Sequence, residues 1–203
     1  MTIDELKKYV SITEIKGDCV RVKANEGYML KLGDSYTDKL YCERSTIPDN
    51  LVVVPYNTYL TESNKEKYKG MTVDEAKEKL IAEIAAYDTS SAVNGFILNG
   101  MLIPWSKDDP NSPNVDKRMG LRQNIADKIA LGEENISIWL KGMSFTMPCA
   151  QAEVLMRSIE NYAYECFNVT AAHKVAVSEL TTIEEVEAYD YKSGYPKMLK
   201  MSV

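Results

Sequence analysis

The side chains of this chain that are most able to do chemistry are its single histidine and its thiols. His173 is the only histidine, so a Ser/His/Asp or Cys/His mechanism has to use it, and Cys166 is the nearest thiol in sequence. Two residues seven positions apart on one helix share a face but stand about 10 Å apart along its axis, beyond hydrogen-bond reach. Pairing with Cys149 through the tertiary fold stays open, beside a surface or capping role for the histidine. We predict no catalytic residue.

Patterns that hold metals or phosphate-bearing cofactors are missing from the sequence. Asp108, Asp109 and Asn111 have the side-chain types of a calcium site, but their loop lacks the glycine hinge and the terminal acid of an EF-hand. No GxxxxGK[ST], GxGxxG or GxSxG motif occurs. We therefore predict neither a metal nor a cofactor. The cysteines form no CxxC pair and are interpreted as reduced thiols: Cys19, Cys42, Cys149 and Cys166.

Composition and charge limit the partners of the chain. Its 203 residues suffice to bury a core without metal or disulfide staples. A formal charge of -6 and a pI near 5.0 repel phosphate backbones, and no dense Lys/Arg cluster stands out in the sequence, so we expect no nucleic acid as a partner. Residues 1–8 lack the apolar run of a signal peptide, and no segment reaches the roughly 18 apolar residues of a membrane helix. We expect a protein made in the cytosol that contacts no membrane.

Residues 1–70 are rich in strand signals and predict a small β-rich N-terminal module. Val20 and Val22 alternate with basic residues, as in a half-buried strand. The apolar run 28–32 leads into Gly33-Asp34, a pair that suits a type II′ hairpin turn. Residues 51–54 predict a further strand, which ends at a proline because proline cannot donate to the ladder.

A second domain is predicted over residues 71–203. The polar stretch from Thr61 to Gly70 is interpreted as the linker that leads into it. Thr72 and Glu75 have the spacing of a capping box, so we expect a helix to begin there. Apolar residues then recur at helical spacing, and this helix should end near Asp88.

Two hairpins and a helix follow. Asn99-Gly100 lies between two apolar triplets and predicts a type I′ turn, because both residues tolerate the left-handed conformation. Apolar residues between Met119 and Ile129 predict a helix closed by Gly132. Alternation on either side of Lys141-Gly142 predicts a second hairpin.

The remaining segments predict a long helix, a short helix and an extended tail from Lys192. Pro148 suits the start of the long helix, which we expect to reach Leu180. Thr181 and Glu184 have capping-box spacing for the short helix. The long helix has apolar residues at spacings of three and four: Ala150, Val154, Leu155, Ile159, Tyr162, Ala163, Cys166 and Phe167.

The order of these elements predicts an α+β fold. It consists of antiparallel hairpins packed against helices, including one long C-terminal helix, preceded by the small β-rich N-terminal module. We expect the two hairpins to join in one antiparallel sheet that is covered by helices on one face. No strand–helix–strand alternation indicates a parallel nucleotide-binding sheet.

Aromatic residues are the candidates for a binding surface. The chain has 13 tyrosines, and tyrosine is favoured where two proteins meet, because its rigid apolar ring has a polar tip. Tyr189, Tyr191 and Tyr195 lie close together near the C-terminus, and with Trp105 they form the candidate protein interface. The alternative for the tyrosines is that they pack back on their own domain.

Several segments between Ala86 and Tyr191, taken in order, match the pattern of a known family. They are Ala86–Asn94, the Asn99-Gly100 hairpin up to Trp105, Arg118–Leu121, Trp139–Pro148, Tyr164–His173 and Leu180–Tyr191. In this order they resemble a domain of unknown function that recurs in tail-associated proteins of phages and prophages, notably those of gut Bacteroidetes. The resemblance covers residues 85–201 and extends faintly into residues 19–60. The loop 106–115 departs from the family pattern, because it is longer and more proline-rich.

The resemblance implies a place among tail and fibre proteins, and the family brings no catalytic residue with it. It predicts a non-enzymatic structural component of a phage or prophage virion, associated with the tail, baseplate or fibre and made in the bacterial host cytoplasm. Its partners would be other phage structural proteins, which it would meet as a homo-oligomer or docked on a symmetric assembly. The alternatives are a tail or fibre assembly chaperone that is not retained in the particle, and a head-tail connector or head fibre component.

Overall fold

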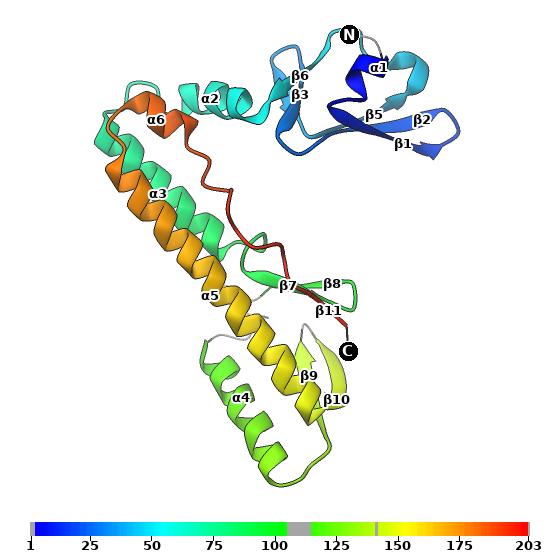
Figure 1. The fold of residues 1–203 in the computed structure, drawn as a ribbon, viewed down its shortest axis with the longest axis vertical. Coiled ribbons are helices and arrows are strands. Elements are labelled where there is room, and N and C mark those ends of the chain that lie inside the picture. Colours follow the sequence, from blue (N-terminus) through cyan, green and yellow to red (C-terminus); the bar gives the residue numbers. More distant parts are fainter. Residues whose placement is uncertain (1–2, 105–114, 141, 203) are drawn as a thin grey trace. The chain divides into compact units, whose positions relative to one another are not determined.

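The chain folds into two compact units. The computed structural model describes residues 3–104, 115–140 and 142–202. One unit consists of Met1–Ala76 and Thr181–Asp190, and the other of Lys77–Leu180 and Tyr191–Val203. The chain passes from the first unit to the second within helix α3 (Val73–Thr89), and helix α6 (Ile183–Ala188) belongs to the first unit again (Figure 1). The mixed α+β fold class predicted from the sequence is confirmed.

Two three-stranded antiparallel sheets form the β part of the first unit. The turn at Gly33-Asp34 joins two of the strands, and Gly33 adopts a φ of +60°, so the predicted hairpin is confirmed. The sheets bury Leu6, Val10, Val20, Val22, Leu30 and Leu51 between them. One sheet has the order β1 (Val10–Lys16), β2 (Cys19–Ala24), β5 (Lys39–Glu43), and the other β4 (Ser35–Thr37), β3 (Tyr28–Leu32), β6 (Leu51–Pro55). Two short helical segments complete this part, α1 (Ile3–Leu6) and η1 (Arg44–Thr46).

Helix α2 (Tyr56–Lys67) occupies most of the stretch that the sequence predicted as a linker, so that prediction is wrong for residues 61–67. The helix has no apolar stripe and therefore gives no periodic signal. It is held instead by Asn64, whose buried Nδ2 donates a hydrogen bond of 2.8 Å to the carbonyl of Glu187 in α6. Tyr68 follows directly and is buried to 1% exposure.

The predicted N-terminal cap of α3 is confirmed, whereas that of α6 lies one residue further along the chain. Thr72 and Glu75 form the predicted box, with Glu75 N donating to Thr72 Oγ1 at 3.3 Å and Thr72 N to Glu75 Oε2 at 2.8 Å. At α6 the prediction is wrong by one residue, because the box joins Thr182 and Glu185. Thr181 and Thr182 each have a glutamate three positions later, so spacing alone does not distinguish them.

Both predicted hairpins form in the second unit, but they do not share a sheet. Asn99 and Gly100 have φ values of +50° and +81°, as a type I′ turn requires. Among the described residues, the two strands of the second hairpin pair only with each other, whereas the first hairpin is joined by the tail strand β11 (Lys200–Met201), which runs parallel to β7. The expectation of one common sheet is therefore wrong. The hairpin strands are β7 (Gly95–Leu98), β8 (Met101–Pro104), β9 (Asn135–Leu140) and β10 (Met143–Pro148).

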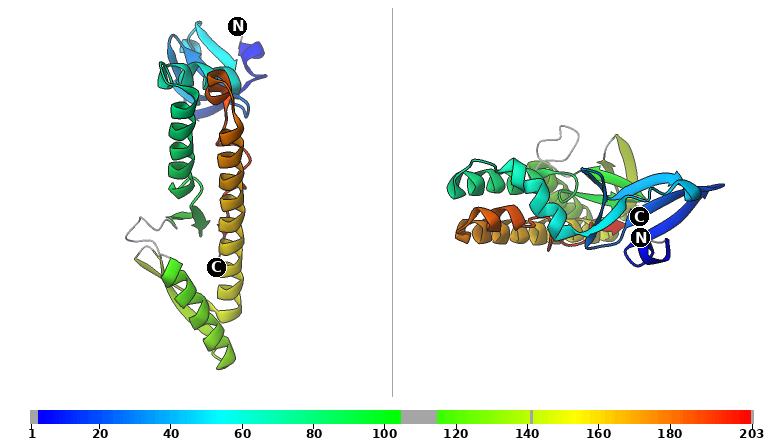
Figure 2. Two further views of the ribbon diagram at one scale, coloured as in Figure 1. Left: turned by 90° about the vertical axis from the view of Figure 1, so that its left-hand side faces the viewer. Right: turned by 90° about the horizontal axis from the view of Figure 1, so that it is seen from above.

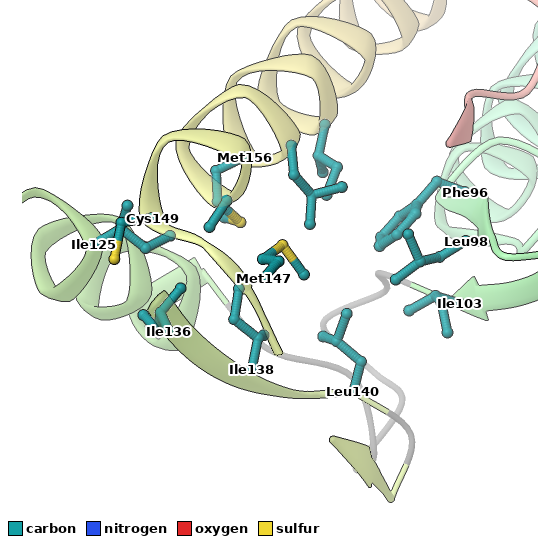
Figure 3. Close-up of a cluster of buried hydrophobic side chains, with 13 residues drawn as sticks. Phe96, Leu98, Ile103, Ile125, Ile136, Ile138, Leu140, Met147, Cys149 and Met156 are labelled. Carbon is teal, nitrogen blue, oxygen red and sulfur yellow. The ribbon is translucent and has the colours of Figure 1, made fainter. Parts of the chain in front are cut away.

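The predicted long helix is α5 (Cys149–Glu179), and the core of the second unit gathers on its N-terminal half. Figure 3 shows Phe96, Leu98 and Ile103 of the first hairpin pointing toward Leu140 and Met147 of the second hairpin beneath this helix. The remaining members come from α4 (Val115–Ala130), β9 and α5: Ile125, Ile136, Ile138, Cys149, Ala152, Leu155, Met156 and Ile159.

The C-terminal half of α5 packs against α3, and the two helices run antiparallel, side by side (Figures 1 and 2). Lys77 Nζ donates to the carbonyl of Leu180 at 3.0 Å, near one end of the pair. Near the other end, Thr170 Oγ1 donates to Asp88 Oδ1 at 2.7 Å. In the described part of the chain, no helix combines the length and the apolar character needed to cross a membrane.

The position of the α6 cap can be tested by paired substitutions. Thr182→Ala removes the hydroxyl that accepts from Glu185 N, and we expect it to lower the free energy of unfolding by about 1 kcal/mol. Thr181→Ala removes only an exposed side-chain contact to Glu185, so its loss should be clearly smaller. Urea titration followed by circular dichroism measures both, and a larger loss at Thr181 would contradict the observed cap.

Candidate interaction surface

The structure keeps His173 apart from the thiols. Its Nε2 lies 2.9 Å from the carbonyl oxygen of Ser193 in the C-terminal tail, and its ring lies 5.7 Å from the ring of Tyr195. Cys149 is the first residue of the same helix, so about 36 Å of helix rise separates it from His173. The pairing of His173 with Cys149 that the sequence left open is therefore not formed.

Cys166 has its own partners in the second unit. Its Sγ lies 3.9 Å from the carbonyl of Val93, and burial raises the pKa of this thiol. Burial also raises the pKa of the neighbouring Tyr162. No group of three His, Cys, Asp or Glu side chains that suits a metal gathers among the residues the structure describes. The Asp108 to Asn111 loop lies outside those residues.

The residues predicted as an interface fall in different places. Tyr191 and Tyr195 belong to the second unit, where their rings pack edge-on against Tyr87 at centroid distances of 5.7 and 5.4 Å. Tyr189 belongs to the first unit, where its backbone N–H donates to the carbonyl of Val186. Trp105 lies outside the described residues. Two of the tyrosines thus pack on their own unit, and a role of these residues in binding a partner stays a prediction.

Tyr195 also belongs to a chain of polar contacts beside a small cavity. The single hydroxyl proton of Thr170 is donated to Asp88, so Tyr195 Oη must donate to Thr170 Oγ1 across their 2.8 Å separation. Burial raises the pKa of Tyr195, which keeps this hydroxyl a donor. Asp88 in α3 thus accepts from Thr170 in α5, which in turn accepts from Tyr195 in the tail, and the two hydrogen bonds connect the three segments.

The cavity itself has a volume of about 110 Å³. Its walls include Asp88, Tyr162, Cys166 and Phe167, together with the start of β7. At roughly 30 Å³ per water molecule it has room for about three or four waters or for one small side chain. Sequence reasoning missed it, because the wall residues come from segments far apart in the chain.

One side of α5 is apolar although it is exposed. Tyr164, Phe167 and Val175 keep 66%, 59% and 59% of their surface exposed, and Ala171 is exposed between them. Spacings of three and four residues place these four side chains in one stripe, which we call the outer face of α5. The rings of Tyr164 and Phe167 stack with their centroids 6.4 Å apart. The outer face lies on the opposite side of the helix from the buried residues Tyr162, Cys166 and Val177.

The outer face itself holds no charged side chain, and charged residues lie only at its borders. Asn168, Ala172 and Ser178 are exposed beside it and uncharged, whereas the charged residues Glu160, Glu165, Lys174 and Glu179 border it. In a chain with 27% charged residues, the four residues of the outer face have the composition of an interface centre, where charged residues are depleted and aromatic residues enriched. The sequence signal for α5 did not separate this side from the core. Phe167 and Val154 recur at helical spacing together with the buried residues, yet both are mostly exposed.

The hydrogen bond of Tyr195 can be tested by removing one atom. Tyr195→Phe leaves the ring against Tyr87 but removes the donor to Thr170. We expect the free energy of unfolding to fall by about 1 kcal/mol. Tyr164→Phe is the control, because this ring is 66% exposed, and it should change stability by less than about 0.5 kcal/mol. Equal effects in urea titrations would contradict the network.

Thiol reactivity should follow the observed burial. Cys19 is exposed, whereas Cys166 is buried and its pKa is raised. Because the thiolate is the reactive form, iodoacetamide at about pH 8 should modify Cys19 at least about tenfold faster than Cys166 in the folded protein. Peptide mass spectrometry measures both rates, and unfolding in urea should remove the difference. Equal rates in the native state would show that Cys166 is accessible.

Comparison of the chain with protein-family models, curated proteins and solved structures finds no match in any of the three. No relative thus assigns a role to the outer face of α5 or to the cavity beside it. Their roles have to follow from the chemistry of the residues themselves.

Proposed function

We propose that this protein is a non-enzymatic structural component of a phage or prophage virion, associated with the tail, baseplate or fibre, and that it works through contacts with neighbouring subunits. The observation that carries the proposal is the outer face of α5, an uncharged stripe with two exposed aromatic rings on a helix of 31 residues. The resemblance of residues 85–201 to a phage-tail-associated domain family supports the choice of particle.

The size of the outer face indicates what kind of contact it makes. Aromatic side chains bury about 150–250 Å² each when fully covered, so covering the exposed parts of Tyr164 and Phe167 removes roughly 250 Å² from water. At about 25 cal/mol per Å² this gains about 6 kcal/mol before the cost of association, which is of similar size. One such contact is weak by itself. It suits an assembly in which many copies are held together and each contact adds to the others.

The proposal is tested in particles of a phage that carries this gene. Tyr164→Glu with Phe167→Glu places two charges on the outer face, while Gln151→Glu adds a charge at an exposed position of the same helix outside it. Mass spectrometry of purified particles should find the unaltered protein and the Gln151 variant as abundant components. The double variant should be depleted at least about tenfold, because a buried unpaired carboxylate costs several kcal/mol.

Each other outcome has a distinct meaning. If the unaltered protein accumulates in infected cells but is missing from purified particles, it acts as an assembly chaperone and the proposal is wrong. If the double variant enters particles as well as the Gln151 variant does, the outer face of α5 is not the contact surface. Circular dichroism of the purified variants shows whether a loss comes from unfolding, since all substituted positions are exposed.

A further inference from the structure

The sheet β1-β2-β5 of the first unit has one face packed on the core and one face turned outward. Val10, Val20 and Val22 point into the core, so the residues that alternate with them project from the other side. Cross-strand pairing arranges these outward residues in three rows. The rows are Ser11–Lys23–Lys39, Thr13–Arg21–Tyr41 and Lys16–Cys19–Glu43, and we call them together the basic face.

The basic face has a charge opposite to that of the chain. It holds four basic side chains and one carboxylate, that of Glu43, in a protein with a formal charge of -6. None of the four basic side chains forms an ion pair with another residue in the part of the chain that the structure describes. Within the described residues, no direct ion pair therefore engages these four charges.

Two features of the basic face are unfavourable for the isolated fold. Lys23 and Lys39 are directly opposite each other on neighbouring strands, and like charges in that position destabilise a sheet. The Nε of Arg21 is buried and has no hydrogen-bond partner among the described residues, which leaves a donor without compensation. A bound anion would relieve the repulsion between the two lysines.

We propose that the basic face binds an acidic segment of a partner protein. The two Nη groups of Arg21 offer paired donors that match a carboxylate, and Lys23 and Lys39 supply two further positive charges beside it. Tyr41 lies next to Arg21, is 58% exposed and adds an aromatic surface with a hydroxyl donor.

The same rows favour a carboxylate-bearing peptide over a nucleic acid. Sheets that read single-stranded nucleic acid stack two or three bases on aromatic side chains, whereas Tyr41 is the only aromatic residue in the three rows. The face is about 10 Å wide across its strands and about 13 Å long. Those dimensions suit a short acidic stretch, and the negative remainder of the chain repels a long phosphate backbone.

The inference stands apart from the proposed function, because it depends on other residues in the other unit. It makes binding through the basic face sensitive to salt, since exposed charge pairs are screened over about 8 to 10 Å at ordinary ionic strength. Loss of the outer-face contact of α5 should leave binding at the basic face unchanged.

The test uses the full chain and a labelled peptide of about ten glutamates, about as many as two strand lengths hold. Fluorescence anisotropy should show binding that weakens when salt is raised from about 50 to about 200 mM. Lys23→Glu with Lys39→Glu should weaken binding at least about tenfold, because it reverses two charges. Lys65→Glu with Lys69→Glu changes the net charge equally at positions on and after α2, and should keep affinity within about twofold.

A second measurement separates a binding surface from an ordinary solvated face. Lys39→Glu alone converts the like-charge pair with Lys23 into an opposite-charge pair, so its Tm should rise while peptide binding falls. A fall in Tm, or affinity equal to that of the unaltered chain, would overturn the proposal. So would the absence of peptide binding at low salt, or tighter binding of a thymidine oligonucleotide of equal charge, which would assign the face to nucleic acid instead.

Discussion

The second unit depends on one side of helix α5, which must bury two different sets of partners along its length. Ala152, Leu155 and Ile159 near its start contact the hairpins and α4, where the apolar core lies. Further along, the thiol of Cys166 contacts the turn before β7, and the hydroxyl of Thr170 contacts α3 and the tail. Because the buried positions recur every three or four residues, one continuous helix serves both sets without a kink.

A helix that uses only one side for its own unit leaves the other side available. In most surface helices that side is charged, and the first turns of α5 follow this rule, with Glu153 and Arg157 paired at 2.6 Å. From Tyr164 onward the middle of that side is the apolar stripe of the outer face, and charged residues such as Lys174 and Glu179 lie at its border. The change occurs where α3 and the tail cover the opposite side of α5, so the exposed rings cannot be explained by a need for core packing.

Local signals in the sequence predicted most elements, because their causes lie within a few residues. The Asn99-Gly100 turn and the Thr72 cap depend on backbone conformations that those residue types favour. The errors occur where distant segments decide. The tail strand β11 takes a position beside β7, and α2 is stabilised through Asn64 by a contact 123 residues away. Neither partner is visible in a local window of sequence.

The candidate surfaces were harder to predict for the same reason. Arg21 and Lys23 alternate with valines and mark the outward side of β2, but Lys39 joins them only through the register of β5. The formal net charge of -6 does not reveal such a cluster, because it adds up the charges of all surfaces of the protein. The like-charge pair of Lys23 and Lys39 lowers the stability of the sheet, so the stability of the fold does not account for it. Charge at paired strand positions is therefore more informative about this face than the net charge of the chain.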